Sequence, residues 1–145
     1  MVPQLADIHY ELKKLSNKEI AEHSKKFYKT GKGQYGDGDL FLGIRVPVLR
    51  KLVKKYQSIK ILEASQMLKS RYHEERLLAV LFLIELFKNG NDFEQKLIFD
   101  LYLKNTKFLN YWILLIFLQE TLLVCFCLEE TERSFTILLN LETFG

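Results

Sequence analysis

Apolar residues recur at helical spacing along most of the chain. Leu5, Ile8, Leu12 and Leu15 are three or four positions apart, so they would line one face of a first helix. Similar spacing predicts further helices at about 17–29, 47–56, 59–68 and 74–87, and a last one to about 104 that Asn91 or Asp92 would cap. No stretch alternates as a strand does, so the pattern predicts an all-α protein.

Local signals mark several helix ends. Ser16 and Glu19 have the spacing of a capping box and would open the second helix. Pro47 suits the first turn of the third helix, and Gly90 would stop the fifth. The segment 30–39 holds four of the seven glycines and is predicted to be a loop.

Paired helices of this length joined by short turns are typical of an α-solenoid of HEAT type. The chain shows no strict internal repeat, so the helix count is the only local support for that architecture.

Charge is distributed unevenly over a composition that is ordinary for a globular protein. Residues 1–60 carry 13 Lys and Arg against 6 Asp and Glu, residues 61–112 are balanced at 7 against 7, and residues 113–145 carry one Arg against five Glu. The basic leading portion suits a polyanionic partner. A lysine-rich solvated surface would produce the same numbers.

The sequence shows no pattern of a cofactor, a metal site or a membrane span. Cys125 and Cys127 are the two cysteines and have no further ligands nearby, so a reducing, cytoplasmic location is expected. The apolar run 113–128 is interrupted by polar residues and falls short of the roughly 20 residues that a span needs. We expect neither a metal nor another cofactor.

Three ordered blocks carry a family resemblance. The first comprises residues 27–39, 41–47 and 49–52, which read FYKTGKGQYGDGD, FLGIRVP and LRKL. The second is residues 70–76, SRYHEER, and the third is YLKNT at 102–106 followed by NYW at 110–112. Together they make residues 1–112 resemble the N-terminal part of the DNA alkylation repair (AlkD-like) family.

The resemblance implies a fold and an activity. The fold would be a right-handed α-solenoid of HEAT-like helix pairs with a basic concave face for duplex DNA that contains alkylated bases. The activity would be excision of N3- and N7-alkylated purines. Such a base is already cationic and leaves readily, so a carboxylate needs only to stabilise the positive sugar that forms.

The same resemblance assigns candidate DNA-binding residues. Trp112 and the adjacent Tyr111 match aromatic residues that pack against the lesion backbone, and Phe27 matches a further aromatic position. Arg45, Arg50 and Lys51 match the region that meets phosphates. For Trp112 and Phe27 a place in the core is the alternative, and for His73 and Glu74 the alternative to chemistry is a helix cap.

The family pattern breaks after Trp112. Where the family continues Asp-Leu-Val-Asp, with the second Asp catalytic, this chain reads Ile-Leu-Leu-Ile, so Ile116 stands at the catalytic position. A family-like continuation, back-translated with one base deleted after the Trp codon, can encode residues 112–123 as they stand. We therefore expect an out-of-frame tail at 113–145. The alternative is a divergent tail that packs as a further helix or in a dimer interface.

Two functions remain open from these residues. One is a truncated, catalytically impaired member of the alkylpurine DNA glycosylase lineage. The other is a non-catalytic helical scaffold that binds DNA or protein. Because a cut repeat array exposes an apolar end, self-association through residues 113–128 is expected.

Overall fold

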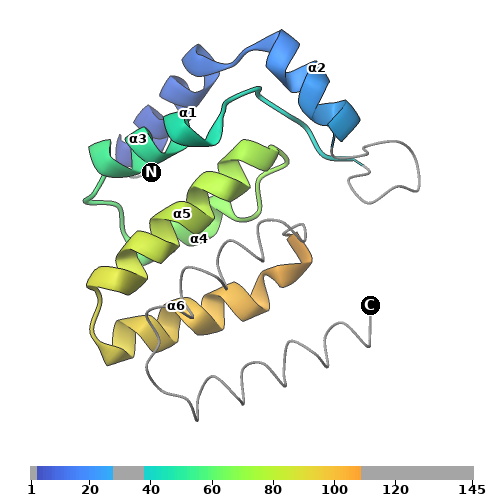
Figure 1. Ribbon diagram of the computed structural model, residues 1–145. Helices are drawn as coiled ribbons and strands as arrows, with labels where there is room; N and C mark the ends of the chain where they lie inside the picture. The colour runs from blue at the N-terminus through green and yellow to red at the C-terminus, as the bar shows by residue number, and fades with distance from the viewer. Residues whose placement is uncertain (1–2, 28–37, 109–145) are drawn as a thin grey trace.

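The computed structural model describes residues 3–27 and 38–108. These residues form helices α1 (Pro3–Leu15), α2 (Lys18–Phe27), α3 (Val46–Lys55), α4 (Ile61–Met67), α5 (His73–Asn89) and α6 (Asp92–Lys104), then a 3-10 turn at Thr106–Phe108 (Figure 1). Within these two ranges the one β-type pairing is a bridge between Leu40 and Tyr72. The all-α prediction is confirmed, whereas the right-handed HEAT-like solenoid stays a prediction.

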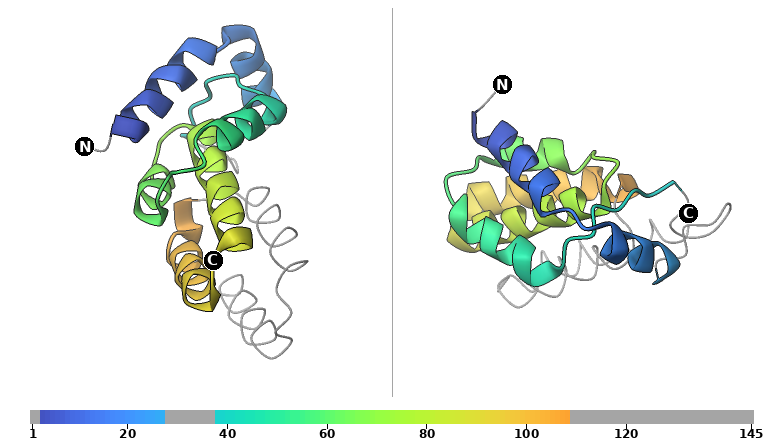
Figure 2. Two further views of the ribbon diagram at one scale, coloured as in Figure 1. Left: turned by 90° about the vertical axis from the view of Figure 1, so that its left-hand side faces the viewer. Right: turned by 90° about the horizontal axis from the view of Figure 1, so that it is seen from above.

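Helix α5 is the centre of the fold. It contacts α3, α4 and α6, and α3 and α4 lie on opposite sides of it (Figure 2). Apolar residues surround its axis instead of forming one stripe, which is the pattern of a helix buried on every side. Leu78, Leu83 and Phe82 are accordingly at most 1% exposed, and they form one core with Ile8 and Leu12 of α1.

The start of α2 differs from the predicted signal. Asn17, not Ser16, caps α2: its Oδ1 accepts from the backbone N–H of Glu19 at 2.9 Å and of Ile20 at 3.1 Å. The Ser16 hydroxyl instead donates to the carbonyl of Lys13 at the end of α1.

The boundaries marked by Pro47, Gly90 and Asn91 agree closely with the sequence. Asn91 caps α6 by accepting from the backbone N–H of Glu94 at 2.9 Å, and the Glu94 carboxylate accepts from the N–H of Asn91 in return. Pro47 lies in the first turn of α3, and Gly90 follows the last residue of α5. The predicted end of the second helix at Lys29 and the glycine-rich part of the loop lie outside the described residues.

Candidate nucleic-acid interface

Helix α3 presents a basic face to solvent. Leu49, Leu52 and Val53 are buried, so the opposite side of the helix carries Arg50, Lys51 and Lys54, all exposed. Arg45 is also exposed and is the N-cap residue of this helix, with φ −79° and ψ 150°. We call Arg45, Arg50, Lys51 and Lys54 the α3 basic face.

The α3 basic face forms no ion pair within the described part of the chain. Of the ion pairs that join side chains in 3–27 and 38–108, none involves its four members. Four positive charges thus lie within ten residues, three on α3 and one at its N-cap. Their spacing follows the helix and does not depend on a ligand.

Lys55 has a different role from its neighbours. Its Nζ contacts both carboxylate oxygens of Glu11 on α1, at 2.8 and 2.9 Å, and the Tyr56 hydroxyl donates to the same carboxylate at 2.6 Å. The hydrogen bond from Lys55, and then that from Tyr56, lowers the pKa of Glu11. Lys55 thus fastens the end of α3 to α1.

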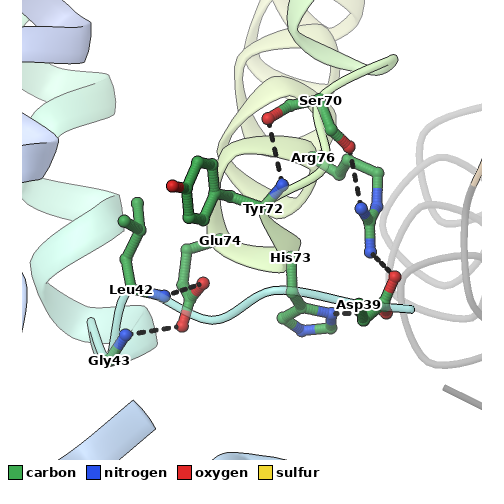
Figure 3. Close-up of polar contacts among 8 residues, drawn as sticks. All are labelled: Asp39, Leu42, Gly43, Ser70, Tyr72, His73, Glu74 and Arg76. Carbon is green, nitrogen blue, oxygen red and sulfur yellow. Dashed lines mark hydrogen bonds and ion pairs between the residues drawn. The ribbon is translucent and has the colours of Figure 1, made fainter. Parts of the chain in front are cut away.

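The beginning of α3 is fastened by a buried carboxylate. Glu74, 3% exposed in the first turn of α5, accepts the backbone N–H of Leu42 at 2.9 Å and that of Gly43 at 3.0 Å (Figure 3). On its other side the same segment accepts a hydrogen bond, because the Leu42 carbonyl receives the N–H of Asn17 at 2.8 Å. We call Glu74, Leu42, Gly43 and Asn17 the Glu74 junction.

Only glycine fits at position 43 of this junction. Its φ of +79° lies in the left-handed region that L side chains rarely adopt. A Cβ atom added there would lie 1.9 Å from the carbonyl oxygen of Asn17 and 2.7 Å from the backbone nitrogen of Ala21. The turn between α1 and α2 therefore packs directly on the Gly43 backbone.

A second set of contacts holds the chain just before the Glu74 junction. Leu40 exchanges backbone hydrogen bonds with the α4–α5 connection: its N–H donates to Arg71 and its carbonyl accepts from His73. Asp39 forms an ion pair with the buried Arg76 at 2.7 Å, and Arg76 also donates to the Ser70 carbonyl at 2.8 Å (Figure 3). The segment 39–43 is thus bound to the start of α5 along its whole length.

His73 is a neutral part of this arrangement. Burial, together with the positive charge of Arg76, lowers the pKa of His73 to about 4. Its Nδ1 lies 4.0 Å from Asp39, but at neutral pH the ring carries no charge and the contact is not an ion pair. The ring instead stacks on Phe41, with 5.1 Å between ring centroids.

The expected helix cap at His73 and Glu74 is wrong. The N-cap residue of α5 is Tyr72, and no side chain caps it. Glu74 lies inside the first turn and extends away from the helix to residues 42 and 43. The neighbouring Glu75 also binds outside the helix, to His9 of α1 at 3.1 Å and to Ser70.

The predicted site residues separate into two groups. Arg50 and Lys51 lie on α3 beside Lys54, which the sequence did not indicate as a site residue, and Arg45 is the N-cap residue of the same helix. Phe27 ends a different helix, α2, and is 65% exposed, so its alternative place in the core is wrong. Trp112, Tyr111 and Ile116 lie outside the described residues.

The Glu74 junction was also missed, although a signal for it existed. Its members Leu42 and Gly43 belong to the first resemblance block, and Glu74, with Arg76, belongs to the second. Gly43 and Glu74 are 31 positions apart and belong to different blocks, so their contact brings the two blocks together in space. A motif in two distant parts can encode a contact between them.

The part of the chain that the structure describes lacks two further features. No group of three or more His, Cys, Asp or Glu side chains there is placed to hold a metal ion. None of the helices in these ranges combines the length and the apolar character that a bilayer crossing requires.

The fold and the site define an all-helical protein with a cationic helix face held by buried polar contacts. Comparison with known proteins gives the family. The model of the DNA alkylation repair enzyme family matches residues 8–134, and the chain belongs to this family. No curated protein and no solved structure matches the chain significantly. The matched range includes both the α3 basic face and the Glu74 junction, and it continues beyond Trp112.

Proposed function

We propose that this protein binds duplex DNA that contains alkylated bases, through the α3 basic face. The observation that carries the proposal is the set of exposed cations on α3 and at its N-cap, which form no ion pair with other described residues, in a DNA alkylation repair family member. Duplex DNA carries one negative charge per about 1.7 Å of its axis, so an ordered row of cations gains affinity by releasing counterions. Arg45 and Arg50 can each bind phosphate oxygens in a bidentate manner.

Salt dependence of DNA binding tests this proposal. The wild-type chain and the double variant Arg50→Ala/Lys51→Ala are titrated onto a fluorescent methylated duplex by anisotropy at several salt concentrations. The slope of log K against log salt is negative, and its magnitude, here called the salt slope, falls by about 2 when two phosphate contacts are lost. The control is Lys96→Ala/Lys104→Ala, an equal charge change at exposed positions of α6. An equal slope in the α3 variant and the wild type would contradict the proposed surface.

For catalysis we propose a descendant of alkylpurine glycosylases whose chemistry is impaired. Ile116 replaces the carboxylate that would stabilise the developing positive charge on the sugar, and an alkyl side chain supplies no such stabilisation. The out-of-frame origin of residues 113–145 is part of this proposal. Release of N7-methylguanine from methylated duplex DNA, measured by chromatography, should remain at the uncatalysed rate. Release at a rate comparable to that of an active family member would overturn it.

The second candidate is a non-catalytic scaffold that binds a protein. Ile116 in place of the catalytic carboxylate favours this candidate as much as it favours an impaired glycosylase. The titration distinguishes the two. A DNA affinity that falls steeply with salt supports the phosphate-binding surface, whereas weak, salt-independent DNA binding supports the scaffold.

A further inference from the structure

Glu74 is buried, and it contacts the backbone of Leu42 and Gly43 just before the α3 basic face. We infer that Glu74 is a positioning residue for DNA binding, which sets the direction of Arg45 at the start of helix α3 through the backbone of Leu42 and Gly43. The inference rests on the proposed function of the α3 basic face. It adds a residue that does not meet DNA itself.

The first step of the argument is the cost of placing a carboxylate at this position. A carboxylate that is 3% exposed needs partners for its charge. Glu74 has the two backbone N–H groups of residues 42 and 43 and lies in the first turn of α5, where the helix dipole favours a negative charge. Both of its oxygens are committed, so the position of the segment is specified at two successive residues.

The second step is the short connection to Arg45. Ile44 is buried, Arg45 is the N-cap residue, and its carbonyl accepts the N–H of Val48 at 3.0 Å and that of Leu49 at 3.3 Å. One residue therefore separates Gly43 from Arg45, and Pro47 restricts the backbone directly afterwards. No flexible residue lies between the Glu74 junction and α3, so a movement of Gly43 is transmitted to Arg45.

The third step compares Glu74 with the carboxylate next to it. Glu75 is also buried and also binds outside α5, but its partners are His9 and Ser70, and neither of these bonds directly to the segment 39–45 within the described residues. Glu74→Gln and Glu75→Gln are therefore matched substitutions with different predicted effects. In Glu74→Gln, the amide nitrogen faces a backbone N–H group and cannot accept its hydrogen bond, so one of the two hydrogen bonds to residues 42 and 43 is lost. In Glu75→Gln, the junction stays closed.

The test measures the salt slope of DNA binding for both variants. A variant that is merely less folded binds less at every salt concentration, but its folded fraction makes the same phosphate contacts and has the same slope. A misplaced Arg45 lowers the slope by about 1. We expect this decrease in Glu74→Gln and the wild-type slope in Glu75→Gln.

A double variant separates failure of the inference from failure of the proposed function. Arg45→Ala alone should lower the slope by about 1, and Glu74→Gln should add nothing to it. If Arg45→Ala leaves the slope unchanged, the proposed surface is wrong and the inference with it. If Arg45→Ala lowers the slope and Glu74→Gln does not, the inference alone is overturned.

A milder variant covers the case in which Glu74→Gln does not fold. Asp39→Asn weakens the ion pair with Arg76, which holds the same segment four residues before Gly43. Asp39 is partly exposed, and the amide oxygen of Asn can still accept from Arg76. The same lowered slope is expected, at a smaller amplitude, and an unchanged slope in this variant overturns the inference.

Discussion

Gly43→Ala tests the close contact at the Glu74 junction. The structure offers a matched control in Gly38, because both glycines have positive φ, at +79° and +83°, but only Gly43 is enclosed. An added Cβ meets nothing within 4 Å at Gly38, whereas at Gly43 it would lie 1.9 Å from the Asn17 carbonyl oxygen. Both variants therefore bear the conformational cost of a positive φ, and only Gly43→Ala bears the steric cost of the added Cβ atom.

The magnitudes follow from these two costs. Alanine in the left-handed region costs about 1–2 kcal/mol, and this is the whole expected effect of Gly38→Ala. At Gly43 the obstacle is backbone, so relief requires separation of the junction. That separation loses the Asn17–Leu42 hydrogen bond at about 1 kcal/mol and at least one hydrogen bond to the Glu74 carboxylate at about 2 kcal/mol. The free energy of unfolding should fall by roughly 4–5 kcal/mol, most of what a marginally stable domain has.

Urea unfolding followed by far-ultraviolet circular dichroism measures both variants. We expect Gly38→Ala to unfold cooperatively at a slightly lower urea concentration than the wild type. Gly43→Ala should be largely unfolded without denaturant, or its free energy of unfolding should be lower by the amount above. If the two variants differ by less than about 1 kcal/mol, the close backbone packing at Asn17 is wrong.

Three further measurements follow from other features. Asn91→Ala should lower the unfolding free energy by about 1 kcal/mol in the same urea titration, because the N–H of Glu94 loses its cap; an unchanged midpoint would contradict the cap. Since the pKa of His73 is lowered to about 4, the unfolded chain binds its proton first as pH falls. Stability should therefore decrease between about pH 6.5 and pH 4, by up to roughly 3 kcal/mol, and His73→Gln should flatten this dependence whereas His23→Gln, at an exposed position, should not. Sequencing of the gene after the Trp112 codon should reveal an Asp-rich continuation one base out of frame, and a tail kept in frame in related genes would refute the frameshift.

The sequence predicts helices well where a single segment determines the outcome. The spacing of apolar residues in α3 gives both its buried side and its basic side, and Asn91 with Glu94 marks the start of α6 without help from the rest of the chain. The cap of α2 was misplaced by one residue because Ser16 and Asn17 are both good caps. Which of the two caps α2 depends on where the preceding helix ends, and the Ser16 side chain contacts that end, at the carbonyl of Lys13.

The Glu74 junction could not be predicted from local pattern. A carboxylate in the first turn of a helix normally stabilises that helix, and nothing near Glu74 indicates that its partners are the N–H groups of Leu42 and Gly43. The positive φ of Gly43 was equally hidden, because the residue follows Leu42 and precedes Ile44 without the usual turn residues. Information of this kind is distributed between two segments and becomes visible only when they meet.

The way α1 is held has a consequence for synthesis of the chain. Ile8 and Leu12 are fully buried in the same core as α5, and His9 binds Glu75 across 66 positions. On the ribosome, α1 therefore emerges well before α5, with which it shares the core, at a rate of about 5–20 residues per second. During those seconds the apolar side of α1 lies open to solvent, and a nascent-chain chaperone would protect it until residue 87 has left the exit tunnel.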